Sequence, residues 1–259
     1  MTGRNACPTV QSIARTQTIS RHNSIQTYWD RSQWPLQSLY FLLPLLVLYE
    51  IGAVMLLSDT QLTANRLLGQ FFAVFGVTGV HLPAIAVVAS LLGMHLARKK
   101  DPWTPEPKLY LVMLGESVFL ALPLFILATV LVREPVVGAS LTSGQWADLK
   151  QKLVIALGAG IYEELLFRML AIALIHLIAR DLLSLPEEVC TVSAVALSSL
   201  GFAAIHFIGG HNPFSMGKML FYTVAGVYFA AIYLGRGFGI VVAVHALYDV
   251  LVFTKAAMS

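Results

Sequence analysis

The stretch Tyr162–Arg168 reads Tyr-Glu-Glu-Leu-Leu-Phe-Arg and lies in the middle of a long apolar run. It places two adjacent carboxylates and a guanidinium where a bilayer would have to solvate them. An ionised group at the centre of a membrane helix costs about 3 kcal/mol even on the milder scales, so such groups face a bundle interior or a wet cavity and mark function. Two later apolar runs carry histidines, His206 and His245. The sequence therefore predicts chemistry inside a membrane.

The overall composition is that of a membrane protein. Hydrophobic residues make up 57% of the 259 residues and charged residues only 12%, against about 25% in soluble domains. Mean hydropathy is +0.74. The net charge of +3 is too small to indicate nucleic-acid binding, and we expect none. Cys7 and Cys190 form neither a disulfide framework nor a CxxC metal site.

Runs of about 20 apolar residues predict transmembrane helices. We expect seven, at residues 35–57, about 79–97, 109–132, about 153–178, about 189–207, about 214–234 and 238–253. A shorter apolar segment at 67–77 is either interfacial or re-entrant, or it adds an eighth span. The expected fold class is all-α, a polytopic transmembrane helical bundle of seven to eight spans.

The expected organisation has three parts. Residues 1–33 form a polar N-terminal tail without the apolar core of a secretory signal peptide. Residues 34–149 supply N-terminal transmembrane helices that act as scaffold or as access for substrate. Residues 150–259 form the catalytic core, because most intramembrane charges gather there. We expect a multi-pass integral membrane protein of the bacterial inner membrane.

The two glutamates of the opening stretch are expected to differ in role. Glu164 and Arg168 are four residues apart, with the acid N-terminal, which is the better order for an ion pair on a helix. Glu163 is turned about 100° away on the same helix and stays available. The alternative is that both acids only hold helices together through ion pairs.

Both histidines occur in a four-residue spacing with a partner. Phe202 precedes His206 by one helical turn, and Asp249 follows His245 by one turn. Asp249 can accept a hydrogen bond from one ring nitrogen of His245, which fixes its tautomer and frees the other nitrogen for chemistry or metal. Taken alone, His206 is more often a packing residue, and the alternative for His245 is a structural His–Asp pair; three such pairs in the second half of the chain reinforce one another. Glu116, inside an earlier span, is an auxiliary or structural acid.

The ordered motifs Glu163-Glu164-x-x-x-Arg168, Phe202-x-x-x-His206 and His245-x-x-x-Asp249 resemble the CPBP family, over roughly residues 150–253. This family contains the CAAX-processing intramembrane proteases (Rce1-like) and bacterial bacteriocin-processing or immunity relatives. The resemblance implies a helical bundle that cuts peptides within or near the bilayer. It implies that Glu163 activates water and that the two histidines assist or stabilise the oxyanion. The Asp249 position is often Asn in the family; Asn can donate a hydrogen bond to an oxyanion, whereas ionised Asp cannot. We therefore expect Asp249 to orient His245 or to be protonated itself.

Two questions stay open at this point. Glu163, His206 and His245 are also a possible catalytic zinc set, but the chain lacks HExxH and leaves no second carboxylate as base, so we favour a glutamate mechanism without a cofactor. The rivals to a protease are an ion- or proton-coupled transporter and a non-catalytic CPBP-type scaffold or immunity protein. The expected partners are the lipid bilayer and a membrane-associated peptide or protein substrate.

Overall fold

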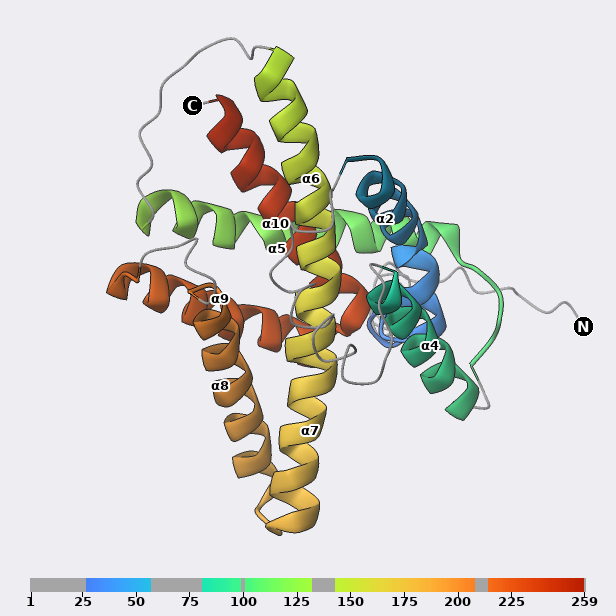
Figure 1. Ribbon diagram of the computed structural model, residues 1–259. Helices are drawn as coiled ribbons and strands as arrows, with labels where there is room; N and C mark the ends of the chain where they lie inside the picture. The colour runs from blue at the N-terminus through green and yellow to red at the C-terminus, as the bar shows by residue number, and fades with distance from the viewer. Residues whose placement is uncertain (1–26, 57–80, 99–100, 132–142, 208–213, 259) are drawn as a thin grey trace, which may run out of the picture.

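The computed structural model describes residues 27–56, 81–98, 101–131, 143–207 and 214–258, and within them every regular element is helical (Figure 1). The main helices are α2 (Pro35–Leu56), α4 (Leu82–Ala97), α5 (Pro107–Leu131), α6 (Ser143–Glu164), α8 (Glu187–Ile205), α9 (Met216–Arg236) and α10 (Phe238–Met258). The predicted all-α class is confirmed, and each of the seven expected spans overlaps a helix. The apolar segment 67–77 lies outside the described residues.

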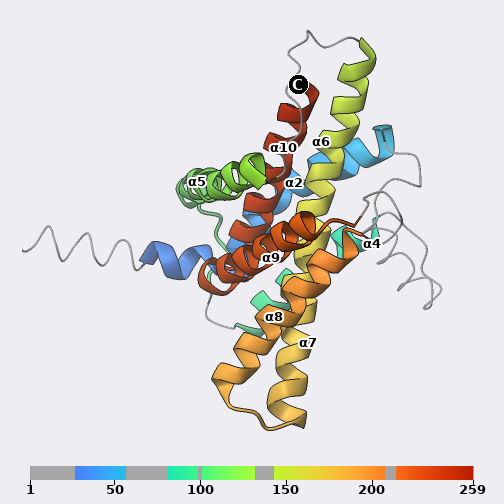
Figure 2. The same cartoon turned by 90° about the vertical axis from the view of Figure 1, so that its left-hand side faces the viewer.

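One long helix carries the opening stretch of sequence. Helix α6 continues without a break into η1 (Leu165–Ala171), α7 (Ile172–Leu177) and η2 (Ile178–Leu182), where η1 and η2 are π-helical. Wide turns of this kind are often found at functional sites. The first begins directly after Glu164 and contains Arg168. Pro186 then caps the start of α8, which runs back beside α7 (Figure 2).

The helices have the length and surface of membrane spans. By length and composition α2, α5, α8, α9 and α10 can cross a bilayer, whereas α4 is apolar but has only 16 residues. Large apolar side chains point outward, including Val54 at 72%, Leu111 at 71% and Phe119 at 70% exposed. Water would disfavour such a surface, because soluble monomers rarely expose large contiguous apolar patches. These side chains suit contact with lipid.

Helix α10 forms the centre of the bundle. It packs against α6, α5, α2 and α9, and its first half is buried on all sides, as expected for a core helix. Gly160 of α6 permits a close approach to α10, because a Cβ there would lie 2.7 Å from the backbone nitrogen of Ala246. Glu164 follows Gly160 by one turn and therefore faces the same helix. This contact brings the acid of α6 to the histidine of α10.

The end of the expected polar tail is part of the fold. Residues 27–32 form a helical turn before α2. Tyr28 donates a hydrogen bond to Glu116 on α5, and Arg31 forms an ion pair with Glu106 at 2.9 Å. The Gln33 side chain donates to the carbonyl of Gly235 at 3.1 Å. Residues 27–33 are thus packed against distant parts of the chain, while residues 1–26 lie outside the described residues.

Candidate active site

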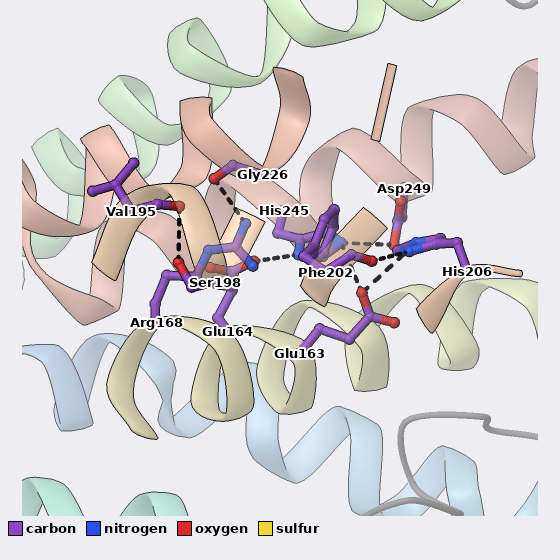
Figure 3. A network of polar contacts seen from close by, with 10 residues as sticks. All are labelled: Glu163, Glu164, Arg168, Val195, Ser198, Phe202, His206, Gly226, His245 and Asp249. Carbon is purple, nitrogen blue, oxygen red and sulfur yellow. Dashed lines mark hydrogen bonds and ion pairs between the residues drawn. The ribbon is translucent and has the colours of Figure 1, made fainter. Parts of the chain in front are cut away.

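Three helices bring the predicted catalytic residues to one point (Figure 3). The Oε2 atom of Glu163 lies 3.9 Å from Nε2 of His206 and 3.9 Å from Nε2 of His245. These separations are far below one helix diameter, about 10 Å. They are too long for a direct hydrogen bond and are the kind of gap that one water molecule bridges. Glu163 Oε2 is buried and has no hydrogen-bond partner among the described residues.

The predicted ion pair between Glu164 and Arg168 is present and buried. Arg168 Nη1 lies 3.1 Å from Glu164 Oε1, and both side chains are at most 1% exposed. Arg168 Nη2 donates to the carbonyl of Gly226 on α9 at 3.1 Å. Its guanidinium also lies over the ring of Phe202, 4.4 Å from the centroid, in a cation–π contact. Arg168 therefore joins α8 and α9 to the helix that carries Glu163.

The partner that orients His245 is Glu164, not Asp249 as the sequence had predicted. We expected Asp249 in that role and Glu164 to serve Arg168 alone. Instead His245 Nδ1 donates to Glu164 Oε1 at 2.6 Å, and Asp249 Oδ2 lies 3.5 Å away on the Nε2 side. The reason is the close approach of α6 and α10 at Gly160, which puts Glu164 nearer than the acid on the histidine's own helix. Glu164 thus holds both the arginine and the histidine.

His206 occupies the C-cap position of α8, near the helix end as expected. Its Nδ1 lies 2.8 Å from the carbonyl oxygen of Phe202. Because a carbonyl can only accept, Nδ1 must carry the hydrogen. With the hydrogen on Nδ1, Nε2 is the ring nitrogen that lies toward Glu163. The Phe202 ring also contacts the His206 ring, with 4.8 Å between the centroids. The four-residue spacing thus places both the backbone carbonyl and the ring of Phe202 against His206.

Two aromatic residues of α9 belong to the site and were not singled out from the sequence. Tyr222 stacks on His206, with centroids 4.0 Å apart and planes at 23°. Phe229 stacks on His245, at 4.5 Å and 16°. The two lie seven residues apart and so share one face of the helix. Their spacing was the available signal, but aromatic residues on an apolar helix indicate only packing until their neighbours are known.

The residue types at the site bear on whether it could bind a metal. A glutamate and two histidines are suitable ligand types for catalytic zinc. Among the residues that the structure describes, no three His, Cys, Asp or Glu side chains are grouped so that they could hold a metal ion. Zinc is therefore tested because Glu163, His206 and His245 are residue types that bind it, not because of how they are grouped.

Part of the chain matches a known protein family. Residues 145–251 match the family model described as type II CAAX prenyl endopeptidase, Rce1-like. Neither a curated protein nor a solved structure matches the chain significantly. The matched segment begins in α6, ends in α10 and includes all seven residues of the three motifs. Together with the apolar helices, the match supports an integral membrane protein and implies a CAAX-type intramembrane endopeptidase. The match of residues 145–251 supports the resemblance of this part of the chain to the Rce1-like proteins of the CPBP family.

Proposed function

We propose that this protein is an intramembrane endopeptidase that hydrolyses a peptide bond of a membrane-associated protein or peptide, with Glu163 as general base. One observation carries the proposal: Glu163 Oε2 lies 3.9 Å from the Nε2 atoms of both His206 and His245. Each histidine is bonded through Nδ1 to another group, so both Nε2 atoms are directed to the space beside Glu163. The polar groups around that space suit a water molecule and the carbonyl group of a substrate.

In the first step, a water molecule donates one hydrogen to Glu163 and the other to Nε2 of His206. Glu163 removes its proton as the water oxygen attacks the carbonyl carbon of the substrate. A carbon–oxygen bond forms, and the carbonyl π electrons move to the oxygen. General base catalysis by a positioned carboxylate typically contributes about 10²- to 10⁴-fold in rate.

In the second step, protonated His245 donates from Nε2 to the oxyanion, while Glu164 holds its Nδ1. A donor fixed in advance where charge develops stabilises the tetrahedral intermediate. The intermediate then collapses, the carbon–nitrogen bond breaks, and Glu163 returns the proton to the leaving amine. Arg168 balances the charge of Glu164, so the acid that orients His245 is not left alone in an apolar setting.

The first substrate to test follows from the description of the matched family, which names a prenyl endopeptidase acting on CAAX sequences. We propose a peptide with a prenylated cysteine near its C-terminus. The purified protein should be reconstituted in liposomes with an S-farnesyl peptide of this kind and with its unprenylated twin. Mass spectrometry of the C-terminal product then identifies the bond that is cut.

The decisive variant is Glu163→Gln, which keeps the shape of the side chain and removes the base. We expect kcat to fall on the order of 10²- to 10⁴-fold with the protein folded. Glu188→Gln on α8 is the matched control, because that glutamate is exposed and outside the site, and it should cleave normally. Undiminished cleavage by folded Glu163→Gln would refute the proposal.

Three further measurements address the alternatives. Elemental analysis with chelation tests the metal: stoichiometric zinc whose removal stops cleavage and whose return restores it would make Glu163, His206 and His245 ligands. Ion flux in the same liposomes, without cleavage, would indicate a transporter, and neither activity would indicate a non-catalytic CPBP-type protein. We also propose a location in the bacterial inner membrane. Separation of the inner and outer membranes of bacterial cells, followed by detection of the protein in each, tests it.

A further inference from the structure

Helix α9 contributes no acid and no histidine, yet it lies against both histidines of the site. Its sequence from Met216 to Arg236 contains two basic residues and several aromatic residues. Tyr222 and Phe229, two turns apart, each lie face to face with one histidine ring. The helix therefore supplies a flat aromatic surface to each of the two imidazoles that flank Glu163.

The two histidines differ in burial and in their position along a helix. The His245 side chain is only 3% exposed, and its Nδ1 bond to Glu164 is a short one of 2.6 Å. His206 is 21% exposed and lies at the end of its helix. The Phe202 carbonyl lies at Nδ1 of His206, and the Tyr222 ring lies against the face of the imidazole. Of the two stacking contacts, this one is made to the more exposed histidine, at a helix end.

We propose that Tyr222 is a positioning residue whose ring sets the plane of His206 and so directs Nε2 toward Glu163. The inference rests on the proposed function and adds a residue that lies outside the three sequence motifs. The aromatic face acts through stacking, at a centroid distance of 4.0 Å and an angle of 23°. Stacked aromatic rings attract each other beyond the simple burial of their surface.

A plain packing role predicts a different result. If Tyr222 only filled space between α8 and α9, its loss would lower stability and leave the chemistry of the folded protein unchanged. If it orients His206, its loss lowers kcat, because displacement of a catalytic group by about 1 Å can reduce the rate about 100-fold. The affinity for substrate, reported by KM, should then change little.

The experiment uses the full-length protein in liposomes and the same farnesyl peptide. Tyr222→Phe keeps the ring and should stay within about threefold of the wild-type kcat, whereas Tyr222→Leu should lower kcat about 10- to 100-fold at unchanged KM. Tyr228→Leu on the same helix is the matched control, because its hydroxyl donates instead to the Leu120 carbonyl of α5 at 2.7 Å. It should keep the wild-type kcat in the folded protein.

A double-mutant cycle separates orientation from other effects. In a His206→Gln background, Tyr222→Leu should cause no further loss, measured at raised enzyme concentration. If Tyr222→Leu does not fold, Tyr222→Met takes its place, because its flexible side chain fills irregular gaps. An equal loss in both backgrounds, or a Tyr222→Phe as impaired as Tyr222→Leu, would overturn the inference. So would normal kcat in Tyr222→Leu while Glu163→Gln is inactive, whereas cleavage by Glu163→Gln would overturn the proposed function instead.

Discussion

Two glutamate–arginine pairs in the described part of the chain are built differently, one fully buried and one half-buried. Glu164 and Arg168 lie one turn apart on a single helix, in contact with the site. Glu116 and Arg236 lie 120 residues apart and join α5 to the end of α9. One pair is local in sequence and shares its acid with a histidine. The other is assembled by the fold and lies against the N-terminal turn.

The pair between α5 and α9 is fully satisfied. Arg236 donates to both oxygens of Glu116, from Nε at 2.6 Å and from Nη2 at 2.8 Å, the two-point geometry of the strongest ion pairs. Its third nitrogen, Nη1, donates to the Trp29 carbonyl, and the guanidinium lies 3.8 Å from the Trp29 ring centroid. Burial raises the pKa of Tyr28, so its phenol stays protonated and donates to Glu116. This pair is suited to holding the N-terminal turn in place.

The pair beside the site is less well satisfied. Glu164 uses one oxygen, Oε1, for both Arg168 and His245. Within the described residues, Glu164 Oε2 and the Nε and Nη1 atoms of Arg168 are buried without a hydrogen-bond partner. Native proteins leave few such groups, and those that remain call for an explanation. The difference indicates that the Glu116–Arg236 pair serves stability. The Glu164–Arg168 pair instead gives up some hydrogen bonding to hold His245 beside Glu163.

The largest expected effect comes from breaking the pair beside the site. Arg168→Met leaves the Glu164 carboxylate buried without its cation, and removing one member of a buried pair destabilises by about 3–5 kcal/mol. We expect a lower melting temperature in detergent and a loss of cleavage. Arg180→Met, at an exposed arginine, is the control and should behave as wild type. Normal melting and cleavage by Arg168→Met would show that the pair has neither role.

Replacing each pair by apolar residues sharpens the comparison. Removing both members of a buried pair together is often neutral for stability, so Glu164→Leu/Arg168→Met and Glu116→Leu/Arg236→Met should both recover folded yield relative to their single variants. Only the first should then lose cleavage, on the order of 10²- to 10⁴-fold, because His245 loses the partner of its Nδ1. Equal kcat in the two folded double variants would contradict the division of roles.

Breaking the distant pair alone should affect stability more than chemistry. Arg236→Met leaves Glu116 with Tyr28 as its one remaining partner in the cluster and should destabilise the protein by about 3 kcal/mol. Cleavage measured per folded molecule should keep its kcat, because neither residue touches Glu163 or the histidines. Thermal melting and single-turnover cleavage of the same preparation check both parts. A kcat loss as large as that of Arg168→Met would mean that this pair also shapes the site.

The smallest expected effect is that of Asp249→Asn. Because Glu164 holds Nδ1 of His245 at 2.6 Å and Asp249 lies 3.5 Å from Nε2, the substitution removes no orienting contact. Asn has nearly the same shape and can also donate a hydrogen bond. We expect kcat within roughly tenfold of wild type, the scale of about 1.4 kcal/mol in the barrier. A loss comparable to that of Glu163→Gln would return Asp249 to the role expected from its spacing.

Much of the architecture and the membership of the site could be predicted from the sequence. Long apolar runs predict membrane helices, because a bilayer requires about 20 residues that satisfy their own backbone hydrogen bonds. The Glu164–Arg168 pair follows from helical periodicity alone, since residues four apart share a face. The cost of isolated charges in hydrocarbon predicted that Glu163, His206 and His245 gather in the bundle. In the structure, Oε2 of Glu163 lies 3.9 Å from Nε2 of each histidine.

Only the tertiary structure decided which side chains became partners across helices. Glu164 reaches His245 because Gly160 lets α10 approach α6 closely, and no spacing within either helix contains that information. The contacts of Tyr222 with His206 and of Arg236 with Glu116 depend likewise on the rotation and crossing of separate helices. Sequence periodicity fixes which residues share a face of one helix, whereas the side chain that each face meets is set by packing between helices.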